Sequence, residues 1–217
     1  MVLVSTALPW ARGGRLANRA GRVFSGEINV PPTLERSVPD LIYTATTASD
    51  YEAFGELVTQ YVEWSRKRYQ DDTWFIEEVF GHQSLASELP TLSTKYGPPN
   101  GKTLLASRDG QVVGAGAYRD LGDGICEMKR LYVGEQFHGH GTGRQLCEAL
   151  IATARDDGFH LMRLDTGNLL KEAIAMYKSI GFRECPPYHD YPAKLMPYLI
   201  FMEMPLTGAP PTQEHTT

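Results

Sequence analysis

The pattern of apolar and polar residues along the chain predicts four helices. They cover residues 51–62, 73–89, the stretch from 143 onward, and 169–181. Ser49 and Glu52 are spaced as a capping box, which predicts the start of the first helix. A break is expected near Gly81 in the second helix. Gly181 is expected to end the fourth, because glycine adopts the left-handed conformation that follows many helices.

Short β-prone runs predict seven strands around these helices. They cover 41–46, two runs within 102–120, then 124–134, 160–167, 182–186 and 197–206. Asp109-Gly110 is a strong hairpin signal between the two runs of 102–120. The resulting order is β, α, α, β, β, β, α, β, α, β, β. It predicts the α/β (α+β) class, with a mixed sheet carrying helices packed on it.

Alternation within the strand 124–134 assigns its side chains to two faces. Glu127, Lys129 and Leu131 are expected on one face, and Met128 and Arg130 on the other. Glu127 therefore lies on the strand that precedes the glycine-rich stretch 136–144.

Composition places these elements in one globular domain. The chain has 217 residues, of which 42% are hydrophobic and 22% are charged. We expect one domain over 41–206, preceded by an Arg-bearing extension over 1–40 and followed by a disordered tail over 207–217. The extension could be an organelle transit peptide, a disordered segment or the product of an upstream start codon. The longest apolar runs are far shorter than the ~20 residues of a spanning helix, so no membrane association is expected.

Charge and cysteine content narrow the function classes. Residues 1–26 carry four arginines and no acid, and the remaining chain has 17 basic against 26 acidic residues. Such an acidic body is unsuited to nucleic acid, whose phosphates attract clustered Lys and Arg. Three widely spaced cysteines make no disulfide framework, so a reducing, cytoplasmic location is expected unless residues 1–40 direct the chain elsewhere.

The stretch 136–144, QFHGHGTGR, stands between a predicted strand and a helix. Alternating glycines there let backbone N–H groups approach an anion closely, and the helix N-terminus adds its positive dipole end. A phosphate or pyrophosphate is the natural ligand, and a tight turn without a ligand is the alternative. The spacing matches neither a P-loop nor the G-x-G-x-x-G of dinucleotide folds.

Two segments together resemble the GCN5-related N-acetyltransferase (GNAT) family. They are MKRLYVGEQFHGHGTGRQLCEALIATA and LDTGNLLKEAIAMYKSIGFRE, in the family's order. The resemblance covers about 41–206. It implies a mostly antiparallel sheet of six to seven strands with about four helices. It also implies that acetyl-CoA donates an acetyl group to a primary amine of a small molecule, amino acid or peptide, by direct attack.

The resemblance also assigns a cofactor site. It places the pyrophosphate on the backbone amides from Gly139 to Arg144, and the pantetheine arm on the segment Leu131 to Val133. His138 stands where the family has Arg or Gln and could offer a ring N–H to phosphate. The implied cofactor-binding residues are thus Leu131, Tyr132, Val133, His138, Gly139, His140, Gly141, Thr142, Gly143 and Arg144.

Two residues are candidates for the chemistry. Tyr177 lies four residues before Gly181-Phe182, as does a family tyrosine near the coenzyme sulfur, and a phenol can donate a proton at neutral pH. A core aromatic is the alternative. Glu127 is the candidate base, with a solvated or ion-paired carboxylate, or a water chain, as alternatives. His138 and His140 lack a third metal ligand at suitable spacing, so no metal is expected.

The acceptor is expected near residues 65–75 and 185–198. Tyr188, Tyr191 and Tyr198 could wall its pocket, and Asp71, Asp72 and Glu127 could favour a cationic amine. The main rival function is a non-catalytic module that binds acyl-CoA on the same fold. A third possibility is an interaction protein with an incidental glycine turn. A homodimer through exposed edge strands is also possible.

Overall fold

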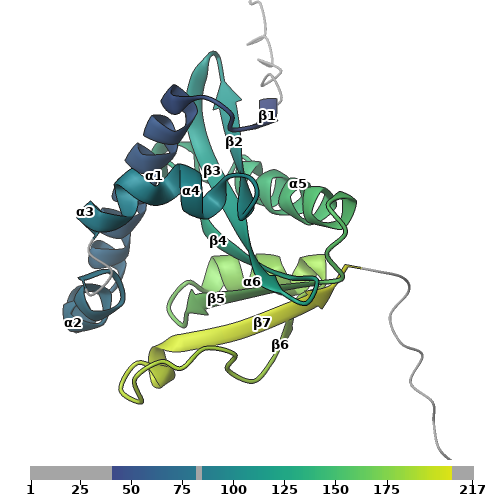
Figure 1. The fold of residues 1–217 in the computed structure, drawn as a ribbon. Coiled ribbons are helices and arrows are strands. Elements are labelled where there is room, and N and C mark those ends of the chain that lie inside the picture. The colour runs from purple at the N-terminus through teal and green to yellow at the C-terminus, as the bar shows by residue number, and fades with distance from the viewer. Residues whose placement is uncertain (1–40, 82–84, 207–217) are drawn as a thin grey trace, which may run out of the picture. The chain divides into compact units, whose positions relative to one another are not determined.

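The computed structural model of the protein describes residues 41–81 and 85–206 (Figure 1). The predicted extension over 1–40 and tail over 207–217 lie outside the described residues. The strands are β1 (Leu41–Thr44), β2 (Gly101–Arg108), β3 (Gln111–Gly122), β4 (Ile125–Val133), β5 (Leu161–Gly167), β6 (Arg183–Glu184) and β7 (Leu199–Pro205). The helices are α1 (Ala48–Arg68), α2 (Thr73–Ile76), α3 (Leu85–Glu88), α4 (Leu92–Tyr96), α5 (Thr142–Asp156) and α6 (Lys171–Ile180).

The seven strands form one mixed sheet in the order β1-β2-β3-β4-β5-β7-β6. Every neighbouring pair is antiparallel except β4 and β5, which are parallel because α5 connects them as a crossover. Asp109 and Gly110 both have positive φ angles and join β2 to β3. The predicted fold class, the mostly antiparallel sheet and the hairpin are therefore confirmed.

Helices cover both faces of the sheet (Figure 1). On one face, α5 and α6 bury apolar side chains against β4, β5 and β7, including Leu146, Leu150, Met128 and Met162. On the other face, α1 and α4 pack on β2, β3 and β4. The sheet is thus the middle layer of the domain, and its strand ends are the places where a site can open between the helices.

The structure corrects two predicted helix boundaries. The capping box of α1 is formed by Thr47 and Asp50: Thr47 Oγ1 accepts a hydrogen bond from the Asp50 amide, and Asp50 Oδ2 accepts one from the Thr47 amide. Ser49, predicted to cap the helix, lies inside it. The second helix was predicted over 73–89. In the structure, α2 ends at Ile76 and a π-helical turn follows over 77–81, and α3 begins at Leu85. Gly181 ends α6 with φ of +125°, as predicted.

A β-bulge in β4 corrects the predicted alternation. Gly116 of β3 lies opposite two residues of β4, Arg130 and Leu131, and Arg130 has a φ of +56°. The extra residue reverses the faces that follow it. Leu131 consequently packs into the core beneath α5, whereas Arg130 shares the opposite face with Lys129. The predicted grouping of Leu131 with Glu127 was therefore wrong.

Candidate active site

The parallel strands β4 and β5 pair over only three residues each. Ile125, Cys126 and Glu127 face Leu161, Met162 and Arg163, and the two strands then continue without pairing to each other. The bulge at Arg130 bends β4 at this point. A cleft of about 610 Å³ lies where the strands part, between α1, α6 and the start of α5. We call it the main cleft.

The glycine loop forms one wall of the main cleft. Gly139 and Gly141 have φ angles of +81° and +85°, and a Cβ on either would meet no atom of the described chain within 4 Å. Gly141 is the N-cap of α5, and no side chain of the described residues caps this helix. The amides of Gly143 and Arg144 in the first turn of α5 are therefore available to an outside acceptor. This arrangement suits an anion at the predicted position.

The side chains of the loop are held by internal contacts. His138 Nε2 lies 2.7 Å from the Val133 carbonyl oxygen, so in the neutral ring this nitrogen is the donor and Nδ1 has no proton. An N–H offered to phosphate from Nδ1 would require the imidazolium. Arg144 pairs with Glu148 at 3.1 Å and donates a hydrogen bond to Ser179.

Most of the predicted cofactor-binding residues gather around the main cleft. Its walls include Leu131, Tyr132, Val133, His138, Gly139, Gly141, Thr142, Gly143 and Arg144. His140 is the exception: its side chain is exposed, and Nδ1 lies 2.9 Å from the His138 carbonyl oxygen. Arg68 of α1 and Glu172 of α6 also line the cleft, and Arg68 contacts both carboxylate oxygens of Glu172.

Tyr177 also lines the main cleft. It lies on α6 with 7% of its surface exposed, and its ring packs edge-on against Phe182. Among the described residues its hydroxyl has no hydrogen-bond partner. Burial, followed by the neighbouring Cys147, Tyr61 and Asp165, raises the pKa of Tyr177 well above its ordinary value. The phenol is therefore protonated at neutral pH.

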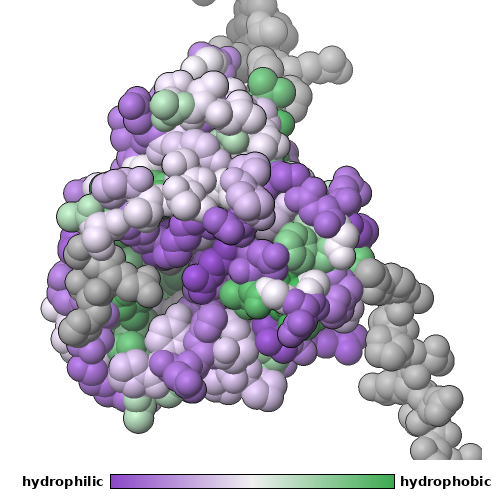
Figure 2. Space-filling model, in the orientation of Figure 1, coloured by the Kyte–Doolittle hydropathy of each residue, from purple (hydrophilic) through white to green (hydrophobic). Residues whose placement is uncertain are grey.

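A second, smaller cavity of about 130 Å³ adjoins the main cleft. We call it the inner cavity. Six residues line both spaces: Tyr61, Lys129, Arg130, Asp165, Thr166 and Leu170. On the face drawn in Figure 2, hydrophilic residues gather beside a hollow in the surface. A group in the inner cavity can thus meet a group in the main cleft at the gap between β4 and β5.

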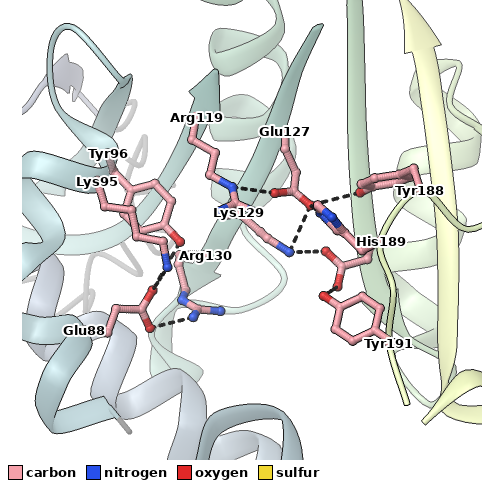
Figure 3. Close-up of polar contacts among 11 residues, drawn as sticks. Glu88, Lys95, Tyr96, Arg119, Glu127, Lys129, Arg130, Tyr188, His189 and Tyr191 are labelled. Atoms are coloured by element: carbon pink, nitrogen blue, oxygen red, sulfur yellow. Dashed lines mark hydrogen bonds and ion pairs between the residues drawn. The ribbon is translucent and has the colours of Figure 1, made fainter. Parts of the chain in front are cut away.

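Glu127 is fully buried and does not line either space. The partners of its two oxygens are Arg119 (Nε–Oε2 2.7 Å), Lys129 (Nζ–Oε1 3.2 Å), Tyr188 (Oη–Oε1 3.2 Å) and His189 (Nε2–Oε1 2.7 Å). Burial raises its pKa, but the cations Lys129 and Arg119 outweigh burial, so the pKa of Glu127 lies below its ordinary value. The carboxylate is ionised and holds these side chains in place (Figure 3).

The carboxylate that borders both spaces is Asp165, which the sequence reasoning missed. It lies on β5, forms an ion pair with Lys129 and accepts a hydrogen bond from Tyr191 at 3.0 Å. Burial raises its pKa, yet Lys129 and Tyr191 hold the pKa of Asp165 below its ordinary value. The available signal was its place near the end of the strand predicted over 160–167, where an acid interrupts an apolar run.

The expected acceptor residues are only partly at this site. Tyr191 lines the inner cavity, and Tyr188 stands behind it on Glu127. Tyr198 instead donates a hydrogen bond to Asp72 at 2.9 Å, and neither residue lines either space. The charged side chains that do line the inner cavity are mostly cations, in contrast to the expected acidic surroundings.

Comparison with known proteins establishes the family. Residues 57–182 match the model of the acetyltransferase (GNAT) family, and the chain belongs to that family. It is 35% identical over 127 residues to an uncharacterized N-acetyltransferase of Schizosaccharomyces pombe, covering 58% of this chain and 76% of that protein. It is 37% identical over 109 residues to the IAA acetyltransferase of Azospirillum brasilense, covering 50% and 70%. The protein is thus an acyltransferase.

Solved structures agree with this assignment. A Klebsiella pneumoniae protein assigned to the acyl-CoA N-acyltransferases has 27% identity and a TM-score of 0.56, over 77% of this chain and 98% of that one. A Salmonella typhimurium protein solved with its cofactor acetyl-CoA has 22% identity and a TM-score of 0.56, over 81% and 99%. This second likeness shows the fold alone.

Within residues 41–81 and 85–206, no helix has the length and apolar character to cross a membrane. The same residues contain no group of three or more His, Cys, Asp or Glu side chains arranged to hold a metal ion.

Proposed function

We propose that the protein transfers an acetyl group from acetyl-CoA to a primary amine by direct attack. The observation that carries the proposal is the junction of the two spaces. The main cleft contains the glycine loop at one end, and it meets the inner cavity between β4 and β5 at the other. When bound, acetyl-CoA supplies the activated thioester. The chain binds the two reactants, orients them and manages protons.

The glycine loop and β4 would hold the donor. The open space above Gly139 and Gly141 and the amides of Gly143 and Arg144 fit a pyrophosphate. The bulge in β4 leaves backbone groups near Leu131 without a partner strand on the side of β5. Such groups can bind an extended arm and donate a hydrogen bond to a carbonyl oxygen that gains charge.

Tyr177 would donate a proton to the leaving thiolate. Its phenol borders the main cleft and is kept protonated by burial. Tyr177→Phe removes only one hydroxyl, so we expect kcat to fall by about 100-fold while the Kd for acetyl-CoA stays within about twofold. Thiol release measures the first quantity and calorimetry the second. Tyr43→Phe at the distant strand β1 is the matched control. Unchanged kcat in Tyr177→Phe would remove the proposed acid.

Two carboxylates compete for the role of base. Glu127, predicted from the sequence, is separated from the inner cavity by its ion pairs, whereas Asp165 borders the cavity directly. A base with a lowered pKa is active above that pKa and loses activity as pH falls through it. Replacing the true base abolishes this acid limb of the kcat/KM profile. Comparison of Glu127→Gln with Asp165→Asn therefore assigns the role, and persistence of the limb in both favours a water chain.

The rival function, a module that only binds acyl-CoA, makes a different prediction. Such a protein binds acetyl-CoA but releases no thiol in the presence of any amine. Release that depends on the amine excludes it. A cytoplasmic location and a homodimer remain predictions from the sequence.

A further inference from the structure

The inner cavity is lined by more cations than anions. Its charged wall residues are Lys95, Arg119, Lys129, Arg130 and Asp165, four positive and one negative. We call the first four the cationic cluster. Two more carboxylates, Glu88 and Glu127, are ion-paired to the cluster but lie behind it, outside the cavity wall. The space itself therefore faces more positive than negative charge.

When the two carboxylates behind the wall are counted as well, the positive charges still outnumber the negative charges by one. Glu88 pairs with Lys95 at 3.1 Å and with Arg130 at 2.6 Å, and it is almost fully buried. The second group is built around Glu127, with Lys129 also shared by Asp165. Four cations thus face three carboxylates in two separate ion-paired groups, and the unmatched positive charge belongs to the group of Glu88, Lys95 and Arg130 (Figure 3). A buried group with an unmatched positive charge is costly, and one monovalent anion would neutralise it.

Two arginines of the cluster retain unused donors. Arg130 Nε is buried and has no hydrogen-bond partner in the described part of the chain. Arg119 uses Nε to contact Glu127, and its two terminal nitrogens have no hydrogen-bond partner among the described residues. A guanidinium group presents its donors in a planar fork that matches the two oxygens of a carboxylate. The two groups therefore contain the donors that a carboxylate requires, in addition to the missing charge.

The position of Asp165 orients such a ligand. Asp165 lies where the inner cavity meets the main cleft, and its carboxylate can accept a hydrogen bond from an ammonium group. An amine at that point is next to the donor cleft, and a carboxylate on the same molecule then extends toward Arg119 and Arg130. The volume of about 130 Å³ equals that of roughly four water molecules, so only a compact head group fits inside.

We infer that the acceptor is an amino acid whose free carboxylate is bound by Arg119 and Arg130. This inference rests on the proposed acetyltransferase function and narrows its substrate class. The ammonium group first releases one proton to solvent, the amine nitrogen then forms the amide bond as the thioester C–S bond breaks, and the second nitrogen proton is finally taken by the thiolate. A peptide or protein N-terminus has no carboxylate close to its amine, so it leaves the cationic cluster unneutralised. Simple alkylamines leave it unneutralised as well.

Matched acceptors test the inference on the full chain with acetyl-CoA. Each of the twenty common amino acids is compared with its own amide and its decarboxylated amine by thiol release. We expect kcat/KM for the best amino acid to exceed that for both matched compounds by at least about 30-fold, because a charge-assisted contact is lost in each. An aminophosphonate analogue, a dianion near neutral pH, should be a poorer acceptor than the carboxylate.

A variant separates recognition from folding. Arg119→Gln can keep one donor to Glu127, and it should lower kcat/KM for the amino acid by about 10- to 100-fold, mainly through KM. The decarboxylated amine should change by less than about threefold, which a merely structural defect would not produce. Arg66→Gln, which removes an exposed cation paired with Glu77 outside both spaces, is the control of equal charge.

Each outcome decides the inference. Equal or faster turnover of the decarboxylated amines, or of the phosphonate, overturns the carboxylate assignment and leaves the acetyltransferase function intact. If acetyl-CoA binds but nothing is acetylated, calorimetry with the amino acids and coenzyme A follows, and absence of carboxylate-dependent binding also overturns it. Failure to bind acetyl-CoA at all instead contradicts the proposed function itself.

Discussion

The glycine loop can be tested with two substitutions that are nearly identical in local structure. Gly141 in the loop has a φ of +85°, and Gly110 in the β2–β3 hairpin has a φ of +80°. An added Cβ meets no atom within 4 Å at either position. The two residues therefore differ in location and not in strain or space. Gly110→Ala is a matched control for Gly141→Ala.

The expected loss of stability is the same for both variants. An alanine at positive φ costs about 1–2 kcal/mol, and the reduced entropy of the unfolded chain returns about 0.4–1 kcal/mol. The net loss is then about 1 kcal/mol. For a domain of this size, that lowers Tm by about 2–4 °C. Differential scanning calorimetry without ligand measures this value in each variant.

Acetyl-CoA binding should distinguish the two. A methyl group on Gly141 would occupy the space that the proposed pyrophosphate needs in order to reach the amides of Gly143 and Arg144. Loss of one charge-assisted hydrogen bond, worth about 1.5–3 kcal/mol, weakens binding by about 10- to 100-fold. Isothermal titration calorimetry should show this for Gly141→Ala and no change for Gly110→Ala. Equal affinity in the two variants would refute the assignment of the pyrophosphate to this loop.

Three further predictions follow from packing, charge and thiol chemistry. Gly116→Ala should destabilise the domain by about 1–3 kcal/mol in a denaturant titration, because its Cβ would lie 2.7 Å from Leu150 Cδ1 and 2.9 Å from Leu131 Cδ1; an unchanged midpoint would contradict the packing of α5. Burial raises the pKa of Glu88, but Arg130 and Lys95 outweigh burial and lower the pKa below its ordinary value of 4.5. The unfolded state therefore binds more protons than the folded state near that pKa, and the Glu88 carboxylate stabilises the fold above pH 4.5. Glu88→Gln should therefore cost about 3 kcal/mol at pH 7, with the difference from wild type shrinking as pH falls through the folded-state pKa, and a constant difference would argue against the ion pairs. Burial raises the pKa of Cys126 and Cys147 to about 12, so neither should react quickly with a disulfide reagent at pH 7.5, and rapid labelling of either would contradict their burial.

Sequence reasoning succeeded where local pattern determines structure. The hairpin at Asp109-Gly110, the end of α6 at Gly181 and the order of the seven strands depend on neighbouring residues, whereas two helices were predicted between β1 and β2 and the structure has the four segments α1 to α4 there. The cap of α1 shows the limit of such signals. Thr47 with Asp50 and Ser49 with Glu52 both have capping spacing, and the choice between them depends on where the chain leaves β1. That point is set by pairing with β2, which a local pattern does not contain.

The site could not be predicted in full because contacts between segments that are distant in sequence bring its residues together. The bulge at Arg130 is defined by pairing with Gly116, whose missing side chain leaves room for Leu131 beside it. The surroundings of Glu127 include His189, 62 residues away. The cationic cluster joins residues of β3, β4 and α4, and only the fold brings them to one cavity. The sequence signal for this cluster was the presence of charged residues, such as Arg119 and Lys129, inside predicted strands.

The measurement that tests the central claim most directly is transfer of a labelled acetyl group. The purified protein is incubated with trideuterated acetyl-CoA and the amino acid panel, and the products are analysed by mass spectrometry. The account predicts a protein-dependent product carrying the deuterated acetyl group on nitrogen, formed together with one equivalent of coenzyme A. Binding of acetyl-CoA without any labelled product from any amine, including simple amines and peptides added to the panel, would contradict catalysis and favour an acyl-CoA-binding module.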